Sequence, residues 1–210
     1  MPLQNRVTPY GSIVATVERG TLMGNRGILH ENGKIFRKSM YQGWKICLLK
    51  FDNNHRKVMS EGRYTELFFL DEATALSAGH RPCFDCQREL FYKFRSCWIK
   101  TNARLYGLHN PMIVEIDRVL HKERITRKEM KVTYQDNALN VGRGAFIELS
   151  GKYYLKWKNR YFEWSPAGYV ASITLPPNQQ VTILTPKSIV RMFKNGYVPN
   201  VHDSVKVIEL

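Results

Sequence analysis

The segment that most restricts the fold of this chain is a close pair of cysteines, Cys83 and Cys86, within residues 79–86. Pro82 predicts a turn before the pair, and apolar residues at helical spacing follow it to about Lys100. The dipole of a helix favours thiolates at its start, and two sulfurs at this spacing can reach one metal ion. Because zinc prefers four tetrahedral ligands, the pair predicts half of a zinc site.

The remaining ligands must come from elsewhere in the chain. Cys97 follows Cys86 by 11 residues on the same predicted helix, which places it roughly 16 Å away and excludes it. Cys47 lies in the β-rich run 44–51, which could fold back over the pair, so it is expected as the third ligand. A histidine is expected as the fourth ligand: His30, with His80 and His55 as alternates.

Local patterns in the first half of the chain predict short strands and three helices. Strands are expected over 12–17, 44–51 and 66–70, with a glycine-punctuated loop over 20–27. Asp71 as N-cap and Gly79 after the last turn delimit a helix over 71–78. The second helix is expected from near Cys83 to about Lys100, and the third from Asn110-Pro111 to about Lys128.

The second half of the chain reads as a β-meander followed by a helix. A loop is expected over 135–144, and strands over 146–149, 153–157, 161–164, 170–175 and 181–184. Thr185 as cap, Pro186 in the first turn and Gly196 at the end delimit a helix over 187–194.

The predicted fold class is therefore α+β: N-terminal strands with a zinc knuckle and helices, then an antiparallel β-meander and a C-terminal helix. Residues 1–105 are expected to form a metal-binding lobe and residues 106–210 a basic lobe, or the two together one compact domain.

Residues 64–86 resemble the second half of the Ada-type metal-binding module. That module has an aromatic-rich strand, an alanine-rich helix and then Ala-Gly-aromatic-Arg-Pro-Cys-x-x-Cys, and here His80 replaces the aromatic residue. The resemblance implies that Cys83 and Cys86 are zinc ligands and that the protein acts on DNA, in repair or defence. Residues 24–30 are similar to the Gly-Asn…His stretch that often accompanies the first ligand pair. No Cys-x-x-x-Cys lies upstream, so the nucleophilic cysteine of phosphotriester repair is not carried over.

The charge of the chain indicates a polyanionic partner. Lysine and arginine number 32 against 18 acidic residues, giving a net charge of +14 and an isoelectric point near 9.7. Such an excess attracts nucleic acid, so DNA or RNA is the expected partner. One expected contact surface surrounds the third helix and comprises Arg118, Lys122, Arg127, Lys128 and Lys131. A second one comprises alternate residues of a strand and its turn, with Tyr154 on the same face: Lys152, Lys156, Lys158 and Arg160.

An enzymatic alternative uses the third helix, where Asp117, His121 and Arg124 share one face. A carboxylate, an imidazole and a phosphate-binding arginine suit a metal-assisted nuclease or phosphodiesterase. Zinc deaminases also contain Pro-Cys-x-x-Cys, but the His-x-Glu that they need upstream is missing, and no βαβ pattern supports redox chemistry. A further alternative is a basic adaptor that binds an acidic protein.

The first ten residues lack an apolar signal region, and no apolar run approaches the roughly 20 residues of a membrane span. We therefore expect a cytoplasmic protein without a membrane anchor, where a close cysteine pair favours metal binding over a disulfide.

Overall fold

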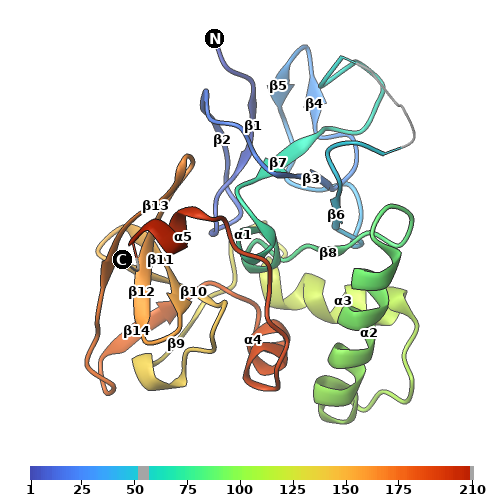
Figure 1. Cartoon of the computed structure of the whole chain (residues 1–210). Coiled ribbons are helices and arrows are strands. Elements are labelled where there is room, and N and C mark those ends of the chain that lie inside the picture. Colours follow the sequence, from blue (N-terminus) through green and yellow to red (C-terminus); the bar gives the residue numbers. More distant parts are fainter. Residues whose placement is uncertain (52–56, 209–210) are drawn as a thin grey trace.

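The N-terminal strands form a six-stranded sheet in the order β2-β1-β7-β3-β6-β8 (Figure 1). The computed structural model describes residues 1–51 and 57–208. The strands of this sheet are β1 (Gln4–Val7), β2 (Ile13–Ala15), β3 (Leu22–Asn25), β6 (Lys45–Cys47), β7 (Leu67–Phe69) and β8 (Arg81–Pro82). A separate hairpin is formed by β4 (His30–Glu31) and β5 (Lys34–Ile35).

Strand β3 occupies part of the segment predicted as a loop over 20–27, so that prediction was wrong there. The glycines suggested a turn, but Gly24 lies in a strand that pairs with both β6 and β7. A Cβ atom at Gly24 would lie 2.4 Å from the Phe69 ring. Glycine is therefore needed for close packing of β3 against an aromatic side chain of β7.

The helices of the first half form in the predicted segments, but several of their boundaries differ. Helix α1 (Glu72–Ser77) is capped by Asp71, whose carboxylate accepts from the backbone N–H of Thr74 at 2.8 Å. Helix α2 (Arg88–Asn102) begins after Cys86 because residues 84–86 form a turn, and a 3₁₀ helix, η1 (Ala103–Tyr106), follows it. Helix α3 (Ile113–Arg124) starts after the predicted Asn110-Pro111, because its N-cap is Met112, whose backbone N–H donates to Glu115. It ends before Lys128, because Ile125 is extended and forms a bridge with Lys131.

The second sheet has the order β13-β12-β11-β10-β14-β9 and contains the predicted meander. Its strands are β9 (Tyr134–Asn137), β10 (Phe146–Leu149), β11 (Lys152–Trp157), β12 (Arg160–Ser165), β13 (Gly168–Ile173) and β14 (Gln180–Ile183). Strand β9 and the 3₁₀ helix η2 (Ala138–Asn140) lie within the predicted loop 135–144. Backbone pairing with β14 holds this edge strand, so it needs no apolar alternation.

Helix α4 (Lys187–Lys194) has the predicted bounds, but its N-cap is Pro186. The hydroxyl of Thr185 instead accepts from the backbone N–H of Phe146 at 2.9 Å, which ties the start of the helix to β10. A last short helix, α5 (Ser204–Ile208), was not predicted and packs on β13. The α+β class is therefore confirmed, with both predicted sheets in place.

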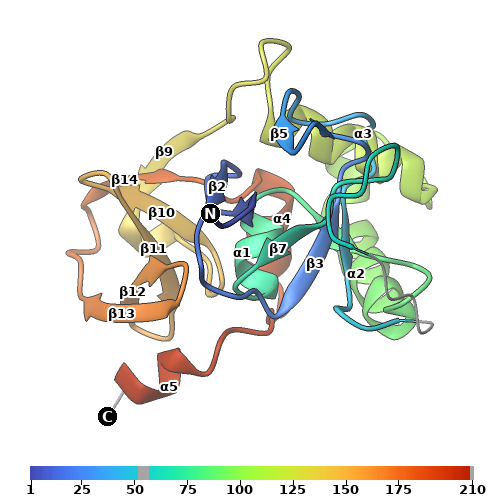
Figure 2. The ribbon, with the colours of Figure 1, turned by 90° about the horizontal axis from the view of Figure 1, so that it is seen from above.

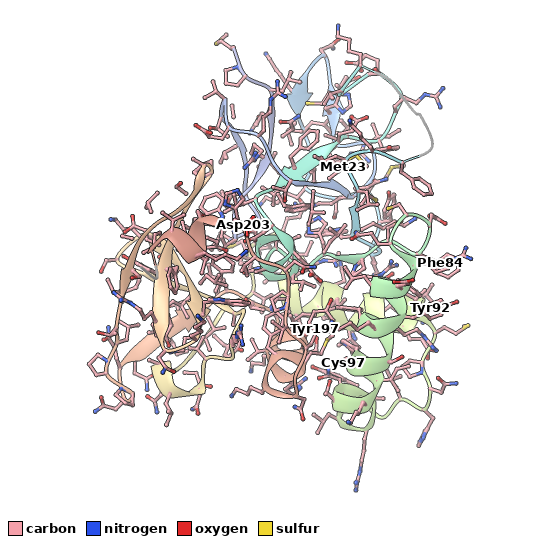
Figure 3. The ribbon with its side chains drawn as sticks, viewed as in Figure 1. Met23, Phe84, Tyr92, Cys97, Tyr197 and Asp203 are labelled. Atoms are coloured by element: carbon pink, nitrogen blue, oxygen red, sulfur yellow. The ribbon has the colours of Figure 1, made fainter. Side chains whose placement is uncertain are left out.

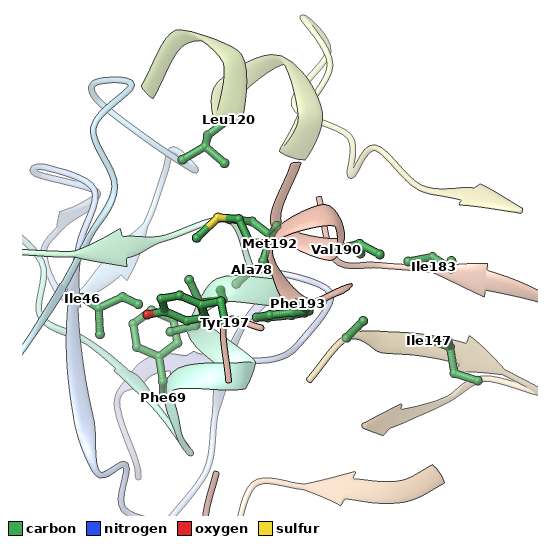
Figure 4. Packing of buried hydrophobic residues seen from close by; sticks show 14 of the residues in the cluster. Ile46, Phe69, Ala78, Leu120, Ile147, Ile183, Val190, Met192, Phe193 and Tyr197 are labelled. Atoms are coloured by element: carbon green, nitrogen blue, oxygen red, sulfur yellow. The ribbon is translucent and has the colours of Figure 1, made fainter. Parts of the chain in front are cut away.

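One buried apolar cluster contains residues from both predicted lobes. Figure 4 shows Ile46 and Phe69 of the first sheet near Tyr197, with Ile147 and Ile183 of the second sheet in the same cluster. Helix α1 contacts both β7 and β10 and lies between the two sheets in Figure 2. Among the described helices, none has the length and apolar character needed to cross a membrane.

Candidate metal centre

Strand pairing brings Cys47 to the Cys83–Cys86 turn. Strands β6 and β8 run parallel, with Lys45 opposite Arg81 and Ile46 opposite Pro82. Cys47 and Cys83 are the next residues along these two neighbouring strands, so both emerge at the same edge of the sheet. The backbone N–H of Cys83 donates to the Ile46 carbonyl at 2.8 Å and fixes this register.

The sulfur atoms of Cys47, Cys83 and Cys86 all lie within 4.8 Å of one another, and the cysteines are free. A tetrahedral ion with bonds of about 2.3 Å holds its sulfur ligands about 3.8 Å apart, so the group fits a metal ion. The backbone N–H of Leu48 also donates to the Cys86 sulfur at 3.4 Å. Such a bond stabilises a sulfur that carries negative charge, as a metal-bound thiolate does.

The pKa values of the three thiols are shifted in different directions. A hydrogen bond from Cys47, with backbone donors at Asp85 and Cys86, lowers the pKa of Cys83. The same contact with Cys83, together with burial, raises the pKa of Cys47, and burial raises that of Cys86. Cys83 is thus the thiol of the three whose deprotonation is favoured, and a bound cation could compensate the negative charge of further thiolates.

Among the described residues, neither His30 nor His80 joins this group. His30 is buried, and its Nδ1 lies 2.6 Å from the Thr65 hydroxyl. His80 accepts a hydrogen bond at Nε2 from Arg26 and packs against Trp44 and Phe69. His55 lies outside the described residues.

Cys97 lies well along α2, separate from the turn at Phe84 (Figure 3), and is not part of the thiol group. Its exclusion by helix geometry is therefore confirmed. The three-cysteine combination Cys47, Cys83 and Cys86 is the part of the predicted metal site that the structure brings together.

Of the three candidate catalytic residues of α3, His121 and Arg124 contact each other, whereas Asp117 pairs with Arg81. Both carboxylate oxygens of Asp117 accept from the Arg81 guanidinium, at 3.0 and 2.8 Å, in a buried ion pair. His121 Nδ1 lies 3.0 Å from Arg124, and Arg124 is buried against the Trp44 ring. Because the carboxylate is occupied by Arg81, it does not orient the imidazole as the nuclease hypothesis requires.

Most of the predicted nucleic-acid contacts lie at the surface. Exposed members of the set are Arg118, Lys122, Arg127, Lys128, Lys152, Lys158 and Arg160. Lys152 forms an ion pair with Glu163, and Lys156 is half-buried over the Tyr161 ring. Tyr154 is buried rather than on an exposed basic face, because both faces of β11 are covered there by apolar residues.

Arg26, Trp44 and Arg81 are important contact residues that the sequence patterns did not single out. Arg26 and Arg124 lie over the Trp44 ring, at 4.0 and 3.8 Å from its centroid. No fixed spacing relates these residues. A usable signal was the arginine of Gly24-Asn25-Arg26-Gly27, which directly follows strand β3.

Comparisons with known proteins find no matching family model, no significantly similar curated protein and no significantly similar solved structure. The fold and the site define an α+β protein with a three-cysteine group that could hold a metal ion. Of the features implied by the Ada-type resemblance, this cysteine group is the one that the described structure supports.

Proposed function

We propose that the protein is a zinc-stabilised nucleic-acid-binding protein. Zinc suits the donor set, because thiolates are its preferred structural ligands. The free state of all four cysteines suits a reducing compartment such as the cytoplasm. The ion would join β6, β8 and the turn before α2. It would thereby stabilise strand β8, whose Arg81 holds Asp117 of α3.

The observation that carries the nucleic-acid proposal is the run of exposed cations along α3 and the loop after it. Arg118 and Lys122 are one helical turn apart, and Arg127 and Lys128 follow in the loop. Among the described residues none of these four forms an ion pair, so their charge is available to a phosphate backbone.

We expect Arg118→Gln and Lys122→Gln to weaken binding to both DNA and RNA duplexes without preference for sequence. Each phosphate contact contributes about −0.9 to the slope of log K against log salt, so each replacement should reduce the slope by about one. Fluorescence anisotropy with labelled duplexes over a range of salt concentrations measures this.

Lys206→Gln is the matched control, because it removes an exposed lysine of α5 that is already paired with Asp203. This variant should keep the wild-type slope. Wild-type protein that binds neither duplex at low salt, or binds with no salt dependence, would contradict the proposed function.

A further inference from the structure

A small pocket beside Trp44 is lined by four cationic side chains from distant parts of the chain. Its lining includes Arg26, Lys38, Arg124 and Lys131, together with Tyr10 and Trp44. The cavity has a volume of about 40 Å³. One water needs roughly 10–15 Å³ on the same kind of measure, so the space suits a small ion with a few atoms.

The positive charge of this pocket is not balanced. Within the described part of the chain, none of the four cations forms an ion pair. Glu129 also lines the pocket, but it contacts Lys38 through its backbone carbonyl. The nearby Asp117 is already paired with Arg81.

The cations are held in place by neutral carbonyl groups. Arg124 donates to the carbonyls of Gly79 and Gln42, and Lys131 donates to that of Ser77 at 2.6 Å. The contacts of the Arg26 terminal nitrogens with the carbonyls of Gly11 and Lys38 are long, 3.3 to 3.5 Å. Carbonyls fix the side chains but do not cancel their charge.

Two of the residues that line the pocket keep donors without a partner. The Nε of fully buried Arg124 has no partner among the described residues. The Lys131 ammonium has three donors, of which the Ser77 carbonyl takes one. A buried donor without a partner costs about 1–3 kcal/mol, more when it is charged, so such groups are normally satisfied by a ligand or water.

Two of the cationic side chains in the pocket have lowered pKa values. Burial lowers the pKa of Arg26 to about 9. Burial, together with repulsion from Arg26 and Arg124, lowers the pKa of Lys131 to about 7. Like charges collected in a partly enclosed space are stabilised by an anion placed between them.

We propose that this pocket binds a phosphoryl group through Arg26, Arg124 and Lys131. A guanidinium group can donate two parallel hydrogen bonds to two oxygens of a phosphate, and an ammonium group adds a compact positive charge. Lys38 is exposed at the rim, where it can meet the group as it enters. The phosphoryl group is either free phosphate or the terminal phosphate of a nucleic-acid strand, and the latter rests on the proposed function.

The test measures phosphate binding by the zinc-loaded full chain at constant ionic strength, with chloride in place of phosphate as the reference. Phosphate should raise the melting temperature of the wild type, and titration calorimetry should give one site. Lys131→Gln removes one charge-assisted contact and should weaken phosphate binding about tenfold or more. Lys206→Gln is the control, because it removes an exposed lysine that lines neither the pocket nor the proposed nucleic-acid surface.

Two oligonucleotides of one sequence, with a 5′-phosphate or a 5′-hydroxyl, identify the source of the group. Preference for the phosphorylated strand that Lys131→Gln abolishes assigns the pocket to strand ends. Phosphate binding without that preference assigns it to free phosphate. No phosphate-specific effect in the wild type, or equal loss in Lys131→Gln and Lys206→Gln, overturns the proposal. Salt-dependent binding of the 5′-hydroxyl strand tests the proposed function separately.

Discussion

Cys47→Ser should lose most of the bound zinc and lower the melting temperature by about 10 °C or more. The replacement removes one of three sulfurs that lie within 4.8 Å of one another. Structural zinc contributes about 10–16 kcal/mol in small zinc-finger peptides, and a chain with its own core should depend on it less. A loss of about 4 kcal/mol corresponds to roughly 8–16 °C in a domain of this size. Elemental analysis and thermal unfolding of the same preparation measure both effects.

Cys97→Ser provides the matched control, since this cysteine lies on α2 away from the thiol group. It should retain about one zinc per chain, as a single site implies. His30→Ala should also keep its zinc, because the His30 ring contacts Thr65 and not the thiols. Wild-type protein that folds normally without metal, or Cys47→Ser protein with full zinc, would show that the site is not structural.

Asp117→Ala should destabilise the protein by about 3–5 kcal/mol, as expected when one partner of a buried ion pair is removed. The change leaves the Arg81 guanidinium buried without its two carboxylate contacts. Arg81 lies in β8, two residues before Cys83, so the disturbance should reach the register that places the cysteines. Urea unfolding gives the free energy, and zinc content reports the effect on the site.

Glu163→Ala supplies the comparison, because it breaks the exposed pair between Lys152 and Glu163. A surface ion pair contributes about 0–1 kcal/mol to stability. Asp117→Ala should therefore lower the free energy of unfolding several times more than Glu163→Ala does. Equal effects of the two variants would contradict the structural role assigned to Asp117. Plasmid cleavage by the wild type that is lost in a folded Asp117→Asn variant would instead revive the nuclease hypothesis.

Features with a local cause could be predicted from the sequence. The meander strands are separated by short turns, and the Asp71 cap and the bounds of α4 depend on residues within a few positions. Cys47 was selected by eliminating Cys97 on helix geometry, which needs only the rise per residue. These predictions succeed because each depends on residues that are close to one another in the sequence.

Features with a distant cause could not be predicted. Gly24 belongs to a strand because of the Phe69 ring, and Asp117 is neutralised by Arg81 from another strand. His30 resembled a ligand by residue type alone, but its ring faces Thr65. Lys131 was expected at the surface with its neighbours. A backbone bridge between Ile125 and Lys131 instead places the Lys131 side chain close to Arg26 and Arg124. No sequence spacing encodes these contacts.

The parallel pairing of β6 with β8 sets an order for assembly. Cys83 and Cys86 share one turn and come together early, whereas Cys47 arrives only after a long intervening segment has closed. A metal ion can therefore be captured weakly by two sulfurs and then retained by the third. Strand β8 has only two residues, Arg81 and Pro82, so its pairing is weak by itself. An ion bound by all three sulfurs would hold this sheet edge closed, and its release would report the opening of the edge.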